Sequence, residues 1–294
     1  MTGGRGFAGS HLVALLRERG VEVAAPSHAE LDLLDGDAVA RALTAARPTA
    51  VFHLAALASV GRSWDAPHEA LRENLAMTVN LLEAVRSSAP AAAVLVTGSG
   101  EVYGPPARLP VDEDAPLRPQ NPYAVSKAAC DLLAGQYADA HGLRVVRTRA
   151  FNHAGPGQSD EYVVGTLTRQ VAEAELEGRS EVVLRTGNVD ARRDFTDVRD
   201  VVRAYAAAVE LEPGAYNICR GEAVAVRELI GIVGQVARVA IRHEVDPGRL
   251  RPNDVPEVRG SAARLSELTG WAPRVALEDT IRDALAAWRE RLRA

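Results

Sequence analysis

The stretch TGGRGFAGSHL (residues 2–12) decides which fold this 294-residue chain adopts. Its glycines Gly3, Gly6 and Gly9 have the spacing G-x-x-G-x-x-G, with Phe7 between them, and lead straight into a helical pattern. Glycines at this spacing let the backbone turn tightly and approach a pyrophosphate, which then lies at the positive end of the helix. The stretch therefore predicts a dinucleotide-binding turn at the start of a βαβ unit.

A turn of this kind normally follows a β-strand, but here the chain begins at Met1. We expect the first strand of the sheet to be missing from this sequence and the native N-terminus to lie upstream. The second strand is expected over residues 21–27, and it ends without a carboxylate. A carboxylate there would repel the 2′-phosphate of NADP(H), so NADP(H) and NAD(H) both stay open as cofactors.

Downstream of the turn, short β-branched runs alternate with longer amphipathic segments. This alternation predicts an α/β fold, a Rossmann-like doubly wound parallel sheet with a smaller C-terminal substrate-binding lobe. Further strands are expected at residues 49–56, 92–99 and 144–151, and helices at residues 10–20, 37–48, 69–89, 121–142, 164–178, 198–210, 226–237 and 277–293.

The alternation of strands and helices becomes less regular from about residue 156, so two domains are expected. Residues 1–155 would form the dinucleotide-binding domain, to which residues 187–220 return. Residues 156–294 would form mainly the lobe that binds a sugar nucleotide. Loops rich in Arg, Asp, Gly and Pro separate the helices of this second part.

The composition limits the kinds of partner that the chain binds. A formal net charge of −5 gives no reason to expect nucleic acid. No run approaches the roughly 20 apolar residues of a membrane helix, and the first residues do not resemble a signal peptide. The two cysteines, Cys130 and Cys219, lie far apart, so we expect buried thiols, no metal site and a reducing cytoplasm.

Tyr123 and Lys127 form a Y-x-x-x-K motif within the helix expected over residues 121–142. The i, i+4 spacing places both side chains on one face of a helix. A free tyrosine has a pKa near ~10, and a lysine ammonium one turn away favours its phenolate. The motif therefore predicts a tyrosine that exchanges a proton with a carbonyl oxygen during hydride transfer.

Ser99 closes the strand expected over residues 92–99. The carboxyl ends of the strands are where open α/β sheets build their sites. A hydroxyl there can hydrogen-bond the substrate oxygen and orient it. Singly, these features also fit an ordinary turn and a surface helix. Their order along one chain, after the glycine turn, predicts that Ser99, Tyr123 and Lys127 form one catalytic group.

Five motifs, TGGRGFAGSHL, FHLAA, SGEVYG, NPYAVSK and FNHAGPGQ, follow one another in the order of a known enzyme family. On these residues the whole chain resembles the extended short-chain dehydrogenase/reductase (NAD-dependent epimerase/dehydratase) family. The stretches GNVDARRDFTDVRD (187–200), RPNDVP (251–256) and TGWAP (269–273) are similar to its 4-ketoreductases. The resemblance implies NAD(P)H-dependent reduction of GDP-4-keto-6-deoxy-D-mannose to GDP-D-rhamnose, with Tyr123 as the proton donor.

The resemblance also implies roles for residues outside the catalytic group. Besides Tyr123 and Lys127, the cofactor-binding positions are Gly3, Gly6, Phe7, Gly9, Asp32, Leu33, Leu54, Ala55, Ala56 and Asn74. The positions for a nucleotide-diphosphate sugar, by family default a GDP-sugar, are Asn152, Asn188, Arg193, Arg251 and Asp254. Arginines fit this partner because the guanidinium fork suits phosphate, and an acidic chain must place such charges locally.

Glu101 keeps other reactions of the family open. It stands where the sister dehydratases have a glutamate that removes a proton beside the keto group, so a GDP-mannose 4,6-dehydratase or a sugar-nucleotide 4-epimerase is the alternative. Ser99, where dehydratases usually have threonine, and FNHAGPGQ favour the reductase. An alternative of another class is a non-catalytic dinucleotide-binding sensor, but such proteins typically lose the tyrosine or the lysine.

A homodimer is the expected assembly. Relatives commonly pair through a four-helix bundle that is built from the two helices expected over residues 69–89 and 121–142. Apolar contacts from the second of these helices would come from Ala128, Leu132, Leu133 and Tyr137.

Overall fold

Four apolar runs of the sequence form a parallel sheet in the computed structural model, which describes residues 1–249 and 255–294. In β2, Val94, Leu95 and Val96 are all buried, because helices cover both faces of the sheet. The order of the strands is β1-β2-β3-β7. They are β1 (Ala50–His53), β2 (Ala93–Thr97), β3 (Val145–Ala150) and β7 (Gly214–Ile218).

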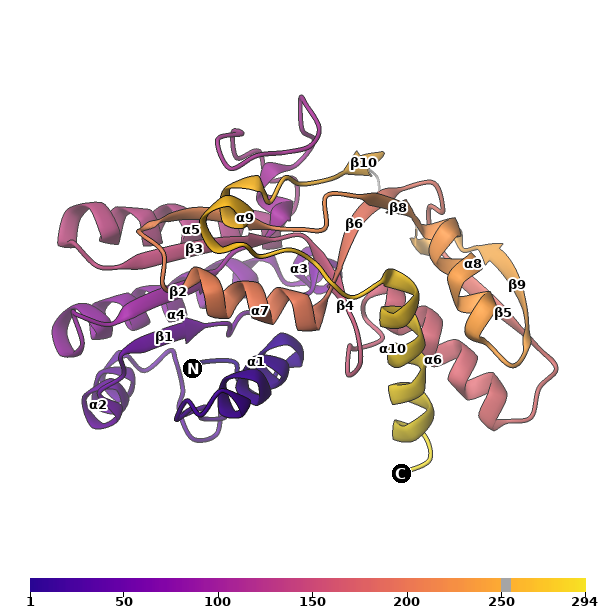
Figure 1. Cartoon of the computed structure of the whole chain (residues 1–294), viewed down its shortest axis with the longest axis horizontal. Helices are drawn as coiled ribbons and strands as arrows, with labels where there is room; N and C mark the ends of the chain where they lie inside the picture. Colours follow the sequence, from indigo (N-terminus) through magenta and orange to yellow (C-terminus); the bar gives the residue numbers. More distant parts are fainter. Residues whose placement is uncertain (250–254) are drawn as a thin grey trace.

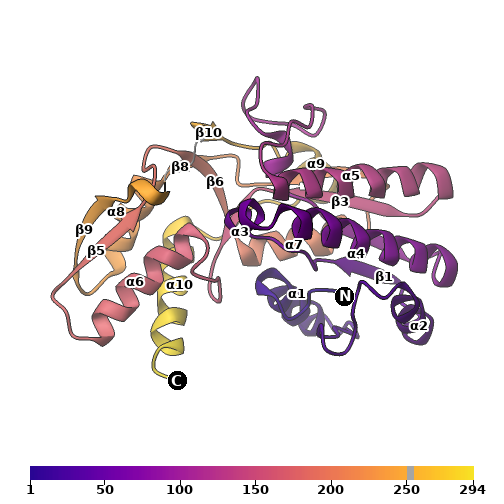
Figure 2. The same ribbon diagram turned by 180° about the vertical axis from the view of Figure 1, so that it is seen from behind.

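Two groups of helices cover this sheet, and Figures 1 and 2 show one group in front of the strands in each view. Phe52 and Leu95 pack with the first group, whereas Val51 and Val94 pack with the second. Neighbouring residues of a strand point to opposite faces, so β1, β2 and β3 contribute to both apolar cores, whereas β7 contributes to the first. The first group is α1 (Phe7–Glu18), α7 (Val198–Ala208) and α9 (Ala263–Thr269), and the second is α2 (Gly36–Ala46), α4 (Pro67–Ser88) and α5 (Pro122–His141).

The second lobe has an apolar core of its own, which includes the fully buried Leu167, Leu229 and Ile281. Three helices and a parallel pair of strands surround it, and Figure 1 shows them on the side opposite the first sheet. These elements are α6 (Val163–Leu176), β5 (Glu181–Thr186), α8 (Val226–Val236), β9 (Ala240–Val245) and α10 (Leu277–Arg291). The three helices agree with the sequence expectation, whereas β5 and β9 were not expected.

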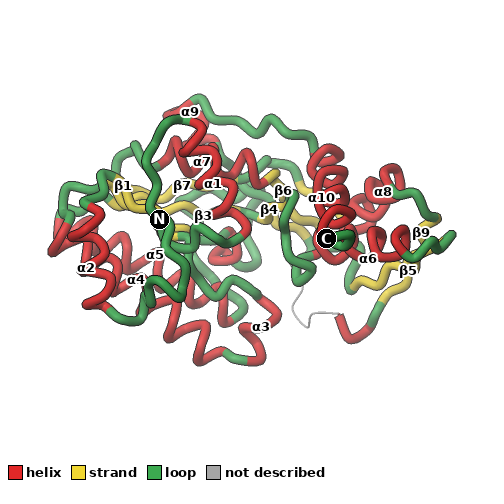
Figure 3. Tube along the Cα trace, turned by 90° about the horizontal axis from the view of Figure 1, so that it is seen from below, coloured by secondary structure: helices red, strands yellow, loops and turns green. Residues whose placement is uncertain are grey.

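A small sheet lies between the two cores, as Figure 3 shows for β4 and β6. Its order is β10-β6-β4, and β8 pairs with β6 antiparallel. These strands are short, and their pairing joins segments that are distant in the sequence. They are β4 (Asn152–Ala154), β6 (Arg192–Asp197), β8 (Ala223–Ala225) and β10 (Glu257–Val258), and the single turn η2 (Pro247–Arg249) follows β9.

The strand expected over residues 21–27 does not form, and this prediction is wrong. A strand needs a hydrogen-bonded neighbour along its length. The segment receives one such bond from the amino group of Met1, which donates to the Ala24 carbonyl (2.7 Å). Thr2 instead extends the sheet beside β1, because its N–H donates to the Phe52 carbonyl (2.9 Å).

A buried ion pair joins α5 to the centre of the sheet. The Arg149 guanidinium in β3 donates through Nε and Nη2 to the two carboxylate oxygens of Asp131 in α5, at 2.9 Å each. Its remaining nitrogen, Nη1, donates to the Tyr103 hydroxyl and to the Glu113 carbonyl, both at 3.0 Å. The Asp131 side chain has no exposed surface and that of Arg149 is 7% exposed. Both charges are therefore matched by partners away from water.

We predict that Asp131→Asn lowers the free energy of unfolding by about 3–5 kcal/mol, because it leaves the Arg149 guanidinium buried without its counter-charge. Urea denaturation followed by circular dichroism measures the change. Asp279→Asn is the control, since Asp279 pairs with Arg282 at the surface and its loss costs less than about 1 kcal/mol. If both substitutions lower the free energy of unfolding equally, the buried ion pair contributes no more stability than the surface pair.

Candidate active site

The glycine turn packs directly against the loop that follows β1. Gly3 has φ +68°, and a Cβ on it would lie 2.6 Å from the Ala55 nitrogen. A Cβ on Gly9 would lie 2.0 Å from the Gly3 carbonyl oxygen. Both positions therefore require glycine for the turn itself. The structure brings together the predicted cofactor residues of the turn and those of residues 54–56.

The turn leaves the N-terminus of α1 open for an anion. Within the described residues, no side chain caps this helix, and its first turn carries no acidic residue. A Cβ on Gly6 would lie 3.3 Å from the Gly3 carbonyl oxygen, a tight contact that a small shift of the turn would have to relieve. Free N–H groups with the helix dipole form a cradle for phosphate, and the turn thus fits the pyrophosphate of a dinucleotide.

Asp32 and Leu33, predicted beside the adenine, follow the irregular segment. Leu33 is buried in the core behind the sheet, so its side chain helps to build the fold. Asp32 is exposed, and its carboxylate accepts from the Leu34 N–H (2.9 Å).

Asn74, which was predicted to line the cofactor, is buried in α4 and uses its whole amide within the protein. Its Oδ1 accepts from the Leu57 N–H (2.7 Å), and its Nδ2 donates to the Leu57 carbonyl (3.2 Å) and to the Ser126 hydroxyl (2.9 Å). The amide thus links the loop after β1 to α5.

Ser99 begins the single turn η1 (Gly100–Tyr103) at the carboxyl end of β2. Its hydroxyl accepts from the Glu101 N–H (3.2 Å) and lies close enough to the Tyr123 phenol to lower its pKa. A Cβ on Gly100 would lie 3.0 Å from the Phe151 ring. This close packing holds the turn against the residue that follows β3.

Tyr123 lies in the first turn of α5. Burial raises the pKa of its phenol well above the ordinary value, and the hydrogen bond with Ser99 opposes that rise. Negative charge on Tyr162 or Glu101 would raise the pKa further. Burial therefore favours the neutral phenol, which is the form that donates a proton.

Lys127 is buried one helical turn after Tyr123, and burial lowers the pKa of its ammonium, while Cys130 and Asp131 oppose the change. Within the described part of the chain, its nitrogen has no hydrogen-bond partner. Burial, followed by the charge of Lys127, also lowers the pKa of His53 to about 3. An ammonium in this place needs an acceptor such as a hydroxyl.

Glu101 is held toward the start of α5 by Asn121, a residue that the sequence analysis did not select. The Asn121 Nδ2 donates to the Glu101 carboxylate (3.2 Å), while its Oδ1 accepts from the Ala124 N–H (2.8 Å) and caps α5. One amide therefore positions both the carboxylate and the helix of Tyr123. An asparagine directly before a helix is a common cap, so only the spatial arrangement reveals its second role.

The FNHAGPGQ stretch contacts the start of α1. The Phe7 ring stacks on the His153 ring with centroids 5.8 Å apart, and it meets the His11 ring edge-on at 5.8 Å. The His11 Nε2 lies 2.9 Å from the Pro156 carbonyl oxygen. Phe7 thus joins the predicted cofactor side to the segment that leads into the second lobe.

The predicted substrate residues are less closely grouped. Asn152 is exposed at the start of β4, directly after β3, and pairs with Phe195 of β6. Arg193 lies in β6 and donates to the Val255 carbonyl (2.7 Å). Asn188 follows β5, and its Oδ1 accepts from the Asp190 N–H (2.9 Å). The two remaining predictions, Arg251 and Asp254, lie outside the described residues.

Tyr162 was also missed by the sequence analysis. It precedes the first turn of α6 in the second lobe, and a charge on it acts on Tyr123. It is partly exposed, at 37%. Its sequence context, between two acids and an apolar run, carries no signal of a site.

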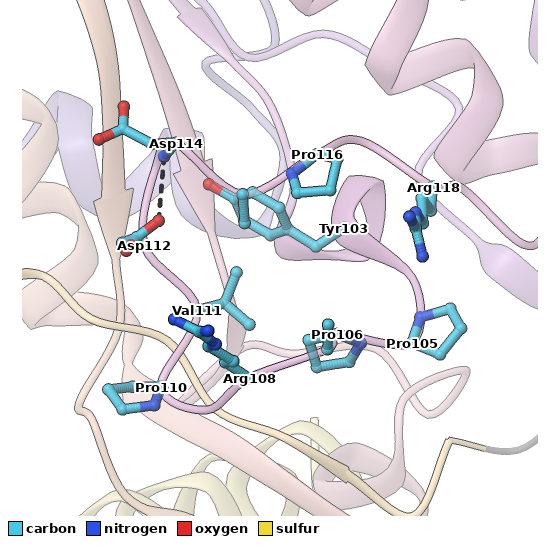
Figure 4. Close-up of a pocket in the computed structure, with 12 residues that line it drawn as sticks. Tyr103, Pro105, Pro106, Arg108, Pro110, Val111, Asp112, Asp114, Pro116 and Arg118 are labelled. Carbon is cyan, nitrogen blue, oxygen red and sulfur yellow. Dashed lines mark hydrogen bonds between the residues drawn. The ribbon is translucent and has the colours of Figure 1, made fainter.

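Figure 4 shows a cavity of about 230 Å³ beneath the proline-rich loop that follows η1. Tyr103 lines it together with prolines and the charged side chains of Arg108, Arg118, Asp112 and Asp114. None of Ser99, Glu101 and Tyr123 lines it. Other residues than the catalytic group therefore line the cavity.

Among residues 1–249 and 255–294, no group of three or more His, Cys, Asp or Glu side chains is placed to hold a metal ion. The same residues form no helix that is long and apolar enough to cross a bilayer. Cys130 and Cys219 are buried free thiols.

Comparison with known proteins agrees with this geometry. The model of the GDP-mannose 4,6 dehydratase family matches residues 26–284. GDP-6-deoxy-D-mannose reductase of Pseudomonas aeruginosa is 39% identical over 100% of this chain and 97% of its own length.

Two solved structures are also similar. One is RMD from Pseudomonas aeruginosa complexed with NADPH, with a TM-score of 0.90 and 36% identity over 98% of this chain and 97% of that one. Thermus thermophilus UDP-glucose 4-epimerase in complex with NAD has a TM-score of 0.85 and 31% identity over the same shares of each chain. The chain therefore belongs to the GDP-mannose 4,6 dehydratase family of extended short-chain dehydrogenases.

Proposed function

We propose that this enzyme reduces the 4-keto group of GDP-4-keto-6-deoxy-D-mannose to give GDP-D-rhamnose. The observation that carries the proposal is the group of Ser99, Tyr123 and Lys127 at the carboxyl edge of the sheet, with Tyr123 as a neutral phenol. The relative of 39% identity, named a GDP-6-deoxy-D-mannose reductase, supports the choice of reaction and of nucleotide.

The cofactor is NADPH or NADH, because the similar structures carry NADPH in one case and NAD in the other. The turn with Gly3, Gly6 and Gly9 would hold its pyrophosphate at the start of α1. Residues 54–56 would line it, and the Lys127 ammonium would bind its ribose hydroxyls. When bound, the cofactor supplies the hydride for reduction.

Each catalytic side chain has a defined task in this reaction. Ser99 donates a hydrogen bond to the ketone oxygen and orients it beside Tyr123. Tyr123 delivers its proton to that oxygen as the carbon becomes tetrahedral. Lys127 stabilises the resulting phenolate by its charge. The raised pKa of Tyr123 keeps the proton in place until the reaction begins.

The substrate would lie across the junction between the two cores. We assign residues 1–155, with residues 187–220, to the dinucleotide-binding domain and residues 156–294 mainly to the sugar-nucleotide lobe. The separate apolar core of the second lobe supports this division. Asn152, Asn188, Arg193, Arg251 and Asp254 would bind the sugar nucleotide.

A second candidate function, 4,6-dehydration or 4-epimerisation, is favoured by Glu101. Its carboxylate is held by Asn121 beside the turn that carries Ser99, where it can remove a proton from a carbon next to the ketone. The GDP-mannose 4,6 dehydratase family model supports this alternative in general terms.

We also propose a homodimer in the cytoplasm, where the buried thiols stay reduced. Of the predicted contact residues, Ala128, Leu133 and Tyr137 pack within the chain instead. Leu132 is 62% exposed on α5, and Leu71 and Leu75 of α4 are also exposed. An exposed apolar surface of this kind is typical of an interface between subunits.

The test of the proposed function uses GDP-4-keto-6-deoxy-D-mannose with NADPH, and loss of the reduced-cofactor absorbance measures turnover. We expect Tyr123→Phe to lower kcat at least about a hundredfold with cofactor affinity nearly intact, because only the proton is lost. Glu101→Gln should retain kcat within about tenfold, since reduction needs no carbon base.

Tyr137→Phe, a matched change on the same helix, should leave turnover intact. A large loss with Glu101→Gln, together with conversion of GDP-mannose without added reductant, would establish the dehydratase instead. Unchanged turnover with Tyr123→Phe would refute its role as the acid, and absence of any turnover would favour a non-catalytic sensor.

Gly6→Ala tests the cofactor site. We expect it to weaken NADPH binding at least about tenfold, because a methyl group blocks the approach of the pyrophosphate, while the melting temperature reports how far the contact with the Gly3 carbonyl disturbs the fold. Calorimetric titration and a thermal melt give the two readings. Gly231→Ala is the control, because a Cβ there meets open space. If Gly6→Ala binds NADPH as tightly as the wild type, the pyrophosphate does not bind at this turn.

Leu132→Asp tests the assembly. We expect the wild-type chain to sediment as a dimer and the variant to sediment with the mass of one chain, because a carboxylate would be buried in the interface. Leu268→Asp, an exposed leucine on α9, should leave the dimer intact. A wild-type monomer, or a dimer that survives Leu132→Asp, would rule out this interface.

A further inference from the structure

The cavity beneath the proline-rich loop takes no part in the chemistry above. The loop, residues 104–118, follows η1, and the cavity has a volume of about 230 Å³. In Figure 4, Pro106 and Pro110 lie on one side of the cavity, and Tyr103 and Pro116 lie on the other. Proline fixes its own backbone angle φ, so these walls are formed before any ligand arrives.

The ring of Tyr103 gives the cavity an aromatic wall. Its hydroxyl donates to the Asn217 Oδ1 (2.7 Å) and accepts from the Arg149 Nη1 (3.0 Å). Because the core of the protein supplies both partners of the hydroxyl, the ring offers carbon rather than a polar group to the cavity. An aromatic ring of a ligand can pack against such a surface.

Four charged side chains line the cavity, and two of them have no partner. The Asp114 carboxylate accepts from the Arg264 Nη2 (2.9 and 3.0 Å), and the Asp112 carboxylate accepts from the Asp114 N–H (3.1 Å). Within residues 1–249 and 255–294, the exposed side chains of Arg108 and Arg118 make no hydrogen bond or ion pair. The groups that remain available to a ligand are therefore two guanidiniums, which select for an anion.

The volume limits the size of that anion. An apolar cavity of about 150 Å³ holds one benzene ring. The cavity of about 230 Å³ therefore fits a ring with one small group attached. Pockets for drug-sized ligands have roughly 300–1,000 Å³, so a nucleotide-diphosphate sugar does not fit and the cavity is not a second substrate site.

We propose that this cavity binds an aromatic carboxylic acid of about the size of benzoate. The ring lies between the prolines and Tyr103, and the carboxylate lies at the rim, where Arg108 and Arg118 donate to it. A guanidinium fork matches the two oxygens of a carboxylate. Binding here requires neither the dinucleotide nor the sugar nucleotide, so the site is independent of the proposed reaction.

A ligand in the cavity also contacts both ends of the loop. Tyr103 is the last residue of η1, and the Arg118 N–H donates to the Val102 carbonyl (2.9 Å). A Cβ on Gly104 would lie 2.0 Å from the Arg118 carbonyl oxygen, so the two ends are packed together. Because a bound acid adds contacts to both ends, we expect it to slow amide hydrogen exchange in residues 102–118.

Fluorine NMR with 4-fluorobenzoate tests the site, because broadening of the probe signal by the protein gives a dissociation constant. We expect 4-fluorobenzyl alcohol, which has the ring without the charge, to bind at least about tenfold more weakly, as loss of charge-assisted hydrogen bonds implies. The double substitution Arg108→Ala with Arg118→Ala should weaken binding of the acid by a similar factor. Hydrogen exchange followed by mass spectrometry, at saturating acid, locates the bound probe.

The matched control combines Arg41→Ala with Arg144→Ala, which remove the same charge from two exposed arginines without side-chain partners among the described residues. It should change the constant by less than about twofold, because salt screens distant charges. Absence of broadening, equal binding of acid and alcohol, or equal effects of the two double substitutions would each overturn the proposal. Displacement of the probe by NADPH, or slowed exchange outside residues 102–118, would place the acid elsewhere and overturn it too.

Discussion

The carboxylate of Asp131 lies inside the protein, and it holds the helix of Tyr123 and Lys127 against the sheet. Two arginines of β3, Arg147 and Arg149, donate to it at 3.3 Å and 2.9 Å. Because removal of one partner leaves the other charge buried, the protein keeps this pair intact whenever it is folded. The Arg149 guanidinium also donates to the Tyr103 hydroxyl at the end of η1. Both α5 and the turn that begins at Ser99 are therefore fixed to β3.

Burial in this frame sets the protonation of the site. It raises the pKa of Tyr123, which keeps the phenol neutral, and it lowers the pKa of Lys127, a change that Cys130 and Asp131 oppose. A proton donor for a ketone has to be protonated before the reaction, and the environment of Tyr123 provides this condition. Asn121 adds the Glu101 carboxylate at a defined place beside the phenol.

The cofactor side and the sugar side meet through ring contacts and short strands. Phe7 at the start of α1 stacks on His153, and the small sheet of β4 and β6 continues from this point toward the second lobe. The glycine turn therefore has three neighbours: the loop after β1, the FNHAGPGQ segment, and Glu30, which pairs with Arg5. Each neighbour comes from a different part of the chain.

The sequence by itself determined the α/β class, the long helices and three of the four strands of the first sheet, β1, β2 and β3, because their apolar periodicity depends on residues a few positions apart. It also selected Ser99, Tyr123 and Lys127 as candidates, whose spacing is local or follows from the rule that sites form at strand ends. Only the tertiary structure decided the irregular path of residues 21–27 and the short strands from β4 to β10, since a strand exists only where a distant segment pairs with it. It alone decided the burial that raises the pKa of Tyr123, the second role of Asn121 and the position of Glu30 beside Arg5. Burial and contacts between remote residues produce these features, and no local pattern records them.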